Sequence, residues 1–301
     1  MTTQRVLAVV AAGMLIVGAW FVRDRVIDDG GASDPSDGAV VCIRDLEEIC
    51  RAVEDDLGVD IRIASVDETL EVWSSEDGIP GEVWVTTAPF PERVDSLREN
   101  ARLAPIDSGV ETVASSPLTL VANADIADDL TTCGDPVDWV CLGSDLPGTK
   151  VGFAPFPHTA IGQLGVTTAV LGFGGGSIPG PGNPAFTVWA RQISAGSRNG
   201  AGEKTAVASI QTRPSLFDVA VGAEAELVDP ADDRFVLLAP ADPTPITVVV
   251  ATPTGTRAPS GLVNAMRDAL ATAGWTSTAT ASTSVSADAM LAVREVWKGY
   301  L

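Results

Sequence analysis

Few residues in this chain are suited to acid–base or metal chemistry. The sequence contains one histidine, His158, and four cysteines. A histidine titrates near neutral pH and can act as a general base, but a single one leaves few routes to a metal cluster or to a histidine-dependent hydrolase triad. The G-x-S-x-G turn of many serine hydrolases is also absent. We therefore expect no catalytic residue, no metal site and no cofactor, and we interpret His158 as a helix cap or a hydrogen-bonded loop residue.

The four cysteines fall into two closely spaced pairs. Cys42 and Cys50 are eight residues apart, and so are Cys133 and Cys141. This spacing favours two local disulfides, although four cysteines allow three pairings and four buried free thiols are the alternative. Disulfides persist in oxidising compartments, so the pattern favours an exported body over a cytosolic one.

The first cysteine pair also constrains where a helix can begin. Eight residues of continuous helix rise about 12 Å, whereas the Cα atoms of a disulfide lie within about 7 Å of each other. A bridge between Cys42 and Cys50 therefore requires the helix to begin between them. Asp45 followed by Glu48 has the pattern of a capping box, which leaves Cys42 in the incoming strand.

The charge balance argues against one broad class of function. The 301 residues include 19 basic and 40 acidic side chains, for a formal net charge of −21. Nucleic-acid binding needs a basic surface that displaces counterions, so we expect no nucleic-acid partner. With 46% hydrophobic residues, the chain can build one large or two medium globular domains.

An apolar run near the N-terminus predicts contact with a membrane. Residues 6–22 (VLAVVAAGMLIVGAWFV) are flanked by Arg5 on one side and by Arg23 and Arg25 on the other. The run is at the short end of the roughly 17 to 25 residues that span a bilayer, but it exceeds the usual core of a signal peptide. It has no Ala-x-Ala exit and no lipoprotein cysteine, so residues 1–23 are interpreted as an uncleaved signal anchor; a cleaved signal and a buried helix are the alternatives.

The remainder of the chain alternates strands and helices. Residues 24–38 are rich in Asp, Gly, Ser and Pro and are expected to form a flexible tether. After them a short β-branched run, a turn and an amphipathic helix recur, which is typical of an α/β fold. The expected strands are 39–43, 59–64, 83–86, 116–122, 150–154 and 246–251. The expected helices are 45–57, 91–102, 159–172, 260–273 and 286–298. The glycine-rich residues 171–184 match neither the dinucleotide nor the P-loop fingerprint and are read as a surface loop or lid.

Several stretches of this pattern carry a family resemblance. Residues 40–57 (VVCIRDLEEICRAVEDDL), 83–90 (VWVTTAPF) and 115–123 (SSPLTLVAN) resemble the opening strand and helix, the third strand with its ligand loop, and the crossover of type II periplasmic, or extracellular, solute-binding proteins. Residues 153–171 and 217–227 resemble parts of the second lobe. Within the family the chain looks most similar to membrane-anchored actinobacterial proteins, and its 16 Arg against 3 Lys fit a GC-rich genome.

The resemblance implies a fold and a domain organisation. The fold would be a two-lobed α/β fold of the type II periplasmic-binding-protein kind, with two hinge strands, preceded by one N-terminal transmembrane helix. Lobe 1 would comprise residues 39–119 plus 243–301, and lobe 2 residues 120–242. Helix N-termini at the carboxyl ends of strands would face the cleft and bind a ligand there.

The resemblance also implies a set of ligand-binding residues. The residues at the matching positions are Arg44, Ser65, Thr86, Thr87, Ser115, Ser116, His158 and Thr159. Hydroxyl groups dominate, which suits an oxyanion or a polyol, but serines and threonines at these places also cap helices. Trp84 and Trp189 are candidates for a wall that stacks on a sugar or a cation.

One departure from the family pattern leaves the ligand class open. Where many anion-binding members have a small residue after the first strand, this chain has Arg44 and Asp45, and Asp67 and Glu68 follow in the second loop. These carboxylates would repel an anion. An oxyanion, a sugar and a cation all remain possible ligands, and so does a cleft that no longer binds a small molecule.

These observations lead to two hypotheses about function. The first is a single-pass cell-membrane protein with an extracellular body that captures a small molecule between its lobes, for an ABC-type permease. The alternative is a non-transport interaction or sensory module that retains a degenerate solute-binding fold and has an envelope protein as its partner. Neither hypothesis assigns an enzymatic activity.

Overall fold

The computed structural model describes residues 38–76, 81–106, 108–180, 182–197, 205–227, 232–242, 244–276 and 285–300. Gly38–Leu301 forms one compact unit. The predicted signal anchor and residues 24–37 of the predicted tether lie outside the described residues. In the described part of the chain, no helix combines the length and the apolar character needed to cross a membrane.

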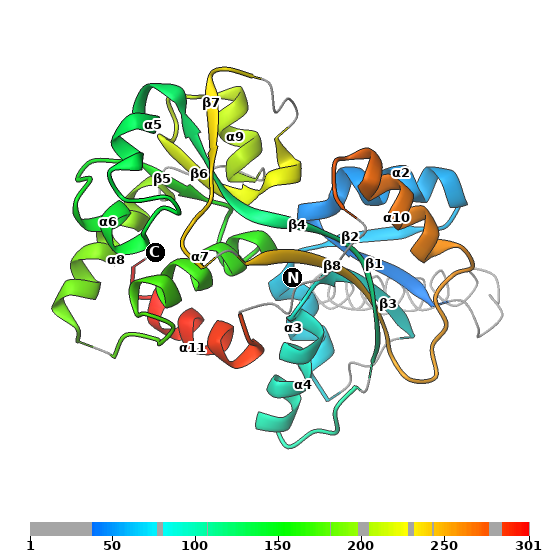
Figure 1. Cartoon of the computed structure of the whole chain (residues 1–301). Coiled ribbons are helices and arrows are strands. Elements are labelled where there is room, and N and C mark those ends of the chain that lie inside the picture. Colours follow the sequence, from blue (N-terminus) through cyan, green and yellow to red (C-terminus); the bar gives the residue numbers. More distant parts are fainter. Residues whose placement is uncertain are drawn as a thin grey trace, which may run out of the picture. The chain divides into compact units, whose positions relative to one another are not determined.

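A single mixed sheet runs through this unit in the order β2-β1-β3-β8-β4-β6-β5, and β7 also pairs with β4 (Figure 1). The strands are β1 (Ala39–Ile43), β2 (Ile61–Ala64), β3 (Glu82–Thr87), β4 (Gly109–Asn123), β5 (Val151–Phe153), β6 (Val219–Ala223), β7 (Phe235–Leu238) and β8 (Pro245–Thr252). β1, β2 and β3 are mutually parallel, whereas β8 is antiparallel to β3 and β4. The sheet is therefore mixed, as an α/β fold with a crossing hinge requires.

β4 joins the two halves of the sheet. Its first part, from Gly109 to Pro117, pairs with β8, while residues 118–123 pair with β6 and β7. The chain returns to the first half through the segment between β7 and β8. We refer to the half with β2, β1, β3 and β8 as lobe 1 and to the half with β5, β6 and β7 as lobe 2.

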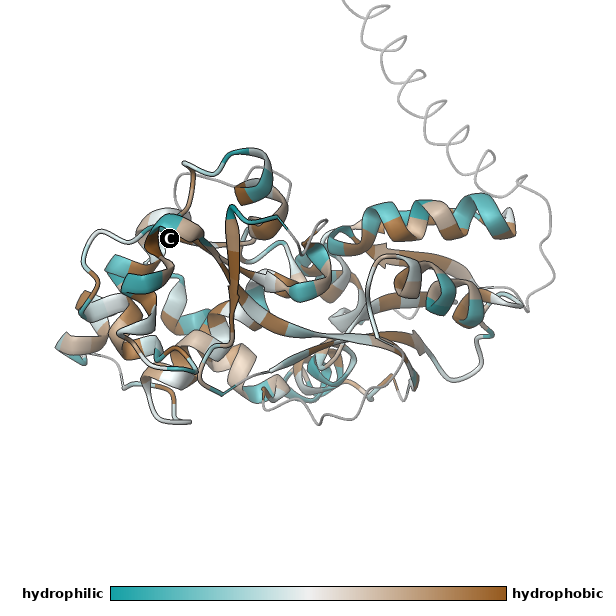
Figure 2. Ribbon diagram, turned by 45° about the horizontal axis from the view of Figure 1, so that its top comes forward, coloured by the Kyte–Doolittle hydropathy of each residue, from teal (hydrophilic) through white to brown (hydrophobic). Residues whose placement is uncertain are grey.

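Helices cover both faces of the sheet in lobe 1. The helical elements of this lobe are η1 (Arg44–Leu46), α2 (Glu47–Leu57), α3 (Val66–Ser74), α4 (Phe90–Asn100) and α10 (Leu262–Thr272). α2 packs against α10, and α3 packs against α4 on the other side of the strands (Figure 1). In Figure 2 the strands are mostly hydrophobic and the helices mix both classes of residue, as expected for helices with one face on a core.

Lobe 2 is built around an aromatic core. Its helical elements are α5 (Ala124–Thr131), α6 (Trp139–Ser144), α7 (Ala160–Phe173), α8 (Pro184–Ser197), α9 (Ala206–Thr212) and η2 (Glu224–Glu226). Phe173, Phe186 and Trp189 have ring centroids 4.8 to 5.6 Å apart. α7 is almost entirely buried.

The C-terminal helix α11 (Ala287–Trp297) contacts elements of both lobes. It packs against α7 and against α4. Its last residue, Trp297, lies edge-on to Phe153 and to Trp189, with centroid distances of 6.4 Å in each case. α11 therefore ties the aromatic core of lobe 2 to a helix of lobe 1.

Most expected elements are present, with three instructive differences. The expected strand at 116–122 is the second part of β4, which begins at Gly109; residues 109–112 are exposed and show no hydrophobic pattern. α3 was not expected. Its start is nevertheless marked by Ser65 and Glu68, because the Glu68 carboxylate accepts from the Ser65 amide at 3.0 Å. α8 was not expected either, and part of the expected loop at 171–184 belongs to α7.

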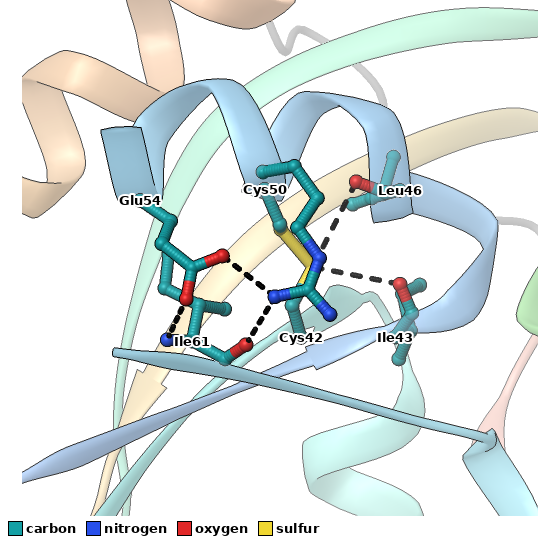
Figure 3. Close-up of a disulfide and its surroundings, with 7 residues drawn as sticks. Cys42, Ile43, Leu46, Cys50, Glu54 and Ile61 are labelled. Carbon is teal, nitrogen blue, oxygen red and sulfur yellow. Dashed lines mark hydrogen bonds and ion pairs between the residues drawn. A yellow bond between two sulfur atoms is a disulfide. The ribbon is translucent and has the colours of Figure 1, made fainter. Parts of the chain in front are cut away.

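Both local disulfides are present, which excludes the alternative of free thiols. Figure 3 shows the bridge between Cys42 and Cys50. The Cα atoms of Cys42 and Cys50 are 6.5 Å apart, and those of Cys133 and Cys141 are 5.4 Å apart. α2 begins between the first two, as predicted. The predicted capping box is wrong, because α2 starts after Leu46 without a side-chain cap and the Asp45 carboxylate is bound elsewhere.

Loss of the first disulfide should weaken the fold measurably. Closing a loop of 8 residues removes unfolded-state entropy equivalent to about 2.5 kcal/mol. We expect Cys42→Ser together with Cys50→Ser to lower the midpoint of thermal unfolding of the full-length protein by several degrees. Dithiothreitol should lower the wild-type midpoint further, because it opens both bridges. An unchanged midpoint in the reduced wild type would show that neither bridge stabilises the fold.

Candidate functional site

The N-terminus of α7 lies at the junction of the lobes and is bound by a carboxylate from lobe 1. The amide of Ala160 donates to Asp45 Oδ2 and that of Ile161 to Asp45 Oδ1, at 3.0 Å in both cases. The first amides of a helix have no intrahelical acceptor and carry positive partial charge. The Asp45 carboxylate therefore occupies the kind of position at which helix N-termini bind oxyanions.

The loop that leads into α7 is closely packed. Thr159 caps the helix, since its hydroxyl accepts from the Gly162 amide at 3.2 Å and donates to the Pro155 carbonyl at 2.9 Å. A Cβ on Gly162 would lie 2.4 Å from the carbonyl oxygen of Ala154. Only glycine fits at this position, and the loop holds the α7 amides in a defined geometry.

A second connection joins the loop before α7 to α3. The Nδ1 atom of His158 lies 3.0 Å from Asp67 Oδ2, and the amide of Val66 donates to the His158 carbonyl at 3.1 Å. The imidazole is 59% exposed, so water weakens this hydrogen bond. Burial raises the pKa of Asp67, but the hydrogen bonds from His158 and Ser65 and the charge of His158 together outweigh that effect, and the net pKa is lowered.

A third connection joins α4 to α7 through Gln163. Arg93 Nη1 donates to Gln163 Oε1, and Gln163 Nε2 donates to the Pro157 carbonyl. Arg93 and Gln163 are almost completely buried, with exposed fractions of 0% and 1%. The two lobes are thus held together by the chain's own side chains at three places: Asp45, His158 and Gln163.

Two acidic groups at the junction have raised pKa values. Burial raises the pKa of Asp45 to about 6, against the opposing hydrogen bonds from Ala160 and Ile161. Burial, together with the nearby charge of Asp45, raises the pKa of Glu226 to about 8. Glu226 therefore holds a proton at neutral pH while Asp45 is mostly ionised. One carboxylate oxygen of Glu226 also accepts from the Ala223 amide at 3.1 Å.

The sequence-predicted ligand residues lie at the ends of strands or beside helix starts, and most are buried. Thr86 and Thr87 end β3, and their hydroxyls are buried without a hydrogen-bond partner. In β4, Ser116 Oγ accepts from the Ala225 amide at 3.0 Å, and the Ser115 carbonyl accepts from the Thr276 hydroxyl at 3.0 Å. The remaining four predicted residues are Arg44 in η1, Ser65 before α3, and His158 and Thr159 before α7.

The structure brings some of these residues together and separates others. Ser65 and His158 lie close together, because the amide of Val66 donates to the His158 carbonyl. Arg44 directly precedes Asp45, whose carboxylate accepts from the Ile161 amide of α7. Thr86 and Thr87 belong to the β3 end, which leads into α4. Within the described residues, no cluster of three or more His, Cys, Asp or Glu side chains has a metal-binding arrangement.

The interpretation of Trp84 and Trp189 as stacking walls is wrong. Both indoles have an exposed fraction of 0%. Trp84 packs on Trp73 at a centroid distance of 5.3 Å, and Trp189 Nε1 donates to the Trp139 carbonyl at 2.7 Å. Both tryptophans belong to the same large hydrophobic core cluster.

Sequence reasoning missed four residues of the junction. Asp45 was interpreted as a cap of its own helix and as a charge that would repel an anion, and Arg93, Gln163 and Glu226 were not singled out. A charged residue in an amphipathic helix normally faces water, so the burial of Arg93 had no signal in the sequence. The Asp45 contact joins residues 115 positions apart in the chain, a distance at which sequence spacing carries no information.

Comparison by sequence gives no match, either to a known family or to a curated protein. Comparison of structures does. The periplasmic binding protein AfuA from Actinobacillus pleuropneumoniae is 12% identical with a TM-score of 0.56, and the match covers 88% of this chain and 98% of AfuA.

Two iron-binding proteins match in the same way. The ferric binding protein from Campylobacter jejuni is 10% identical with a TM-score of 0.56, covering 87% of this chain and 98% of its own. Iron-bound HitA from Pseudomonas aeruginosa is 12% identical with a TM-score of 0.51, covering 87% and 99%. The chain therefore has the two-lobed fold of the periplasmic binding proteins.

Proposed function

We propose that this chain is a membrane-anchored extracellular solute-binding protein that captures a small ligand between its two lobes and presents it to a membrane partner such as an ABC-type permease. The observation that carries the proposal is the arrangement of the Ala160 and Ile161 amides at the start of α7, which both donate to the Asp45 carboxylate. We refer to this pair of amides as the α7 seat. A seat that binds the Asp45 carboxylate has the geometry and the partial charge to bind the carboxylate, phosphate or sulfate of a ligand.

The comparison supports this proposal at the level of the fold. AfuA was solved with fructose-6-phosphate bound, so a protein of this fold holds a phosphorylated sugar. In this chain a ligand that binds at α7 must displace Asp45. We therefore infer an oxyanion-bearing ligand that competes with the chain's own carboxylate.

The predicted anchor at residues 6–22 and the two disulfides fit this assignment. The disulfides favour an oxidising compartment, and an apolar N-terminal run would hold the body at the outer face of the cell membrane. A binding protein tethered in this way stays close to a permease in the same membrane.

The binding of Asp45 at the α7 seat also favours a second candidate function. The Asp45 carboxylate binds the α7 amides, and His158 and Gln163 also form hydrogen bonds across the junction, so the chain's own side chains hold the two lobes together. A module that works permanently in this form would be an interaction or sensory element of the cell envelope, not a transport component.

A ligand panel distinguishes the two functions. We expect the unfolding midpoint of the full-length protein, purified in detergent, to rise with one class among phosphates, sulfates, carboxylates, sugars, amino acids, polyamines and metal ions. Binding to the native state adds about 2.7 kcal/mol at a hundredfold excess over Kd. If Asp45 competes for the α7 seat, Asp45→Ser should bind the same ligand at least tenfold more tightly. The control is Asp67→Ser, whose affinity should stay within about threefold.

A flat panel for both the wild type and Asp45→Ser, each with a cooperative unfolding transition, would reject transport of a small solute. The interaction-module function would then stand. A response to cations or sugars that Asp45→Ser leaves unchanged would keep solute binding and reject the oxyanion class.

A further inference from the structure

Arg93 is a buried cation with unused hydrogen-bond donors. It lies in the first turns of α4 and has an exposed fraction of 0%. Its Nη1 atom donates to Gln163, whereas Nε and Nη2 are buried without any partner. A buried guanidinium is costly unless its charge and its N–H groups are matched. For Arg93, both the opposite charge and the acceptors for Nε and Nη2 are missing among the described residues.

The positive charge of a second arginine, Arg294, acts on Arg93. Arg294 lies in α11, which packs against α4, and its Nε is also buried without a partner. Burial and the positive charge of Arg294 together lower the pKa of Arg93 to about 10. Two neighbouring positive charges repel each other, and an anion beside them would relieve that repulsion.

No carboxylate of the described residues supplies that anion. Neither arginine forms an ion pair with a described Asp or Glu. Glu295, next to Arg294, is 72% exposed and bound to Lys298 at 2.7 Å. The guanidinium of Arg93 instead lies 5.7 Å from the ring centroid of Phe90, which contributes no full negative charge.

On the face of the sheet that α4 covers, further hydrogen-bond donors have no partner. Thr86 pairs with Val249 across β3 and β8, and paired residues of antiparallel strands point to one face, which they share with positions two residues away. Thr86, Thr247 and Trp84 therefore share the face on which Trp84 meets Phe90 of α4. The hydroxyls of Thr86 and Thr247 are buried without partners.

We propose that Arg93 and Arg294 form a binding site for a small inorganic anion where α4, α7 and α11 meet. Guanidinium groups stay protonated at neutral pH and match oxyanions through paired N–H bonds. An anion there would neutralise the repulsion and hold α11 of the C-terminus against α4. The site differs from the α7 seat, which is made of backbone amides and is filled by Asp45.

Calorimetric titration of the full-length protein tests the site. The protein is dialysed into a buffer free of small anions, and inorganic phosphate, sulfate and chloride are added separately at constant ionic strength. We expect one of them to bind at one per chain. Arg93→Met and Arg294→Gln should each weaken that binding at least tenfold, whereas the exposed Arg191→Gln, with the same loss of charge, should change it less than twofold.

The two sites are separable in the same experiment. Asp45→Ser should leave the binding governed by Arg93 and Arg294 unchanged within twofold. If no anion binds the wild type, or if binding rises in Asp45→Ser and is unaffected by Arg294→Gln, the arginine site is rejected. Arg294 is only partly buried, so Arg294→Gln decides the outcome even if Arg93→Met fails to fold.

Discussion

Glu226→Gln is expected to make the protein more stable than the wild type at pH 8 and to remove most of the pH dependence of its stability above pH 5. The pKa of Glu226 is raised from 4.5 to about 8. Between these values the folded state keeps a proton that the unfolded state has released, so the free energy of unfolding falls as pH rises. For a shift of this size the wild type should lose on the order of 3 to 4 kcal/mol between pH 5 and pH 8.

Urea denaturation of the full-length protein at pH 5, 6, 7 and 8 measures this effect. Glu226→Gln should retain only a fall of about 1 kcal/mol that ends near pH 7, because the pKa of Asp45 is raised from 3.8 to about 6 and acts in the same direction. Glu224→Gln is the matched control, since Glu224 lies in the same short helix and is exposed. If Glu226→Gln and the wild type lose stability in parallel, Glu226 is ionised in the folded protein.

Asp45→Ala should release the junction between the lobes. Two hydrogen bonds from amides to a charged acceptor disappear, and the α7 amides lose their acceptor at a helix start. Allowing for the relief of burying a carboxylate, we expect a loss of about 3 kcal/mol in the free energy of unfolding at pH 7. Asp67→Ala, which removes the carboxylate partner of the exposed His158, should cost less than about 1 kcal/mol.

Amide hydrogen exchange tests whether the loss of stability in Asp45→Ala arises at the two amides that Asp45 binds. The amides of Ala160 and Ile161 should exchange at least tenfold faster in Asp45→Ala than in the wild type, while amides in the sheet of lobe 1 stay protected. The variant should also lower the pKa of Glu226, because the nearby negative charge is gone. Unchanged exchange at both amides would mean that Asp45 is not their acceptor in solution.

The interpretation of His158 as a hydrogen-bonded loop residue is consistent with its contacts, since its imidazole meets Asp67 and its carbonyl accepts from Val66. The same two contacts show why a role could not be read from the residue alone. Asp67 is 91 positions away, and only the closure of the lobes brings the two side chains together.

Local patterns in the sequence determined much of this protein. β-branched runs such as 246–251 predicted the central strands, because a buried strand must be apolar along its length. The spacing of Cys42 and Cys50 placed the start of α2 between them, since a continuous helix would separate the sulfur atoms too far. Thr159 was correctly placed before a helix because hydroxyl residues accept from the first free amides.

Only the tertiary structure decided what fills the junction. Asp45 looked like the cap of its own helix, but α7 offers it two amides that the folded chain brings close to it. Arg93 looked like a solvent-facing residue of a polar helix until α11, from the far end of the chain, covered α4. Charge and hydrogen-bonding capacity are properties of a residue, whereas its partners and its burial depend on segments distant in sequence. The sequence therefore showed which polar residues were present, whereas only the folded structure showed that Asp45 binds the α7 amides.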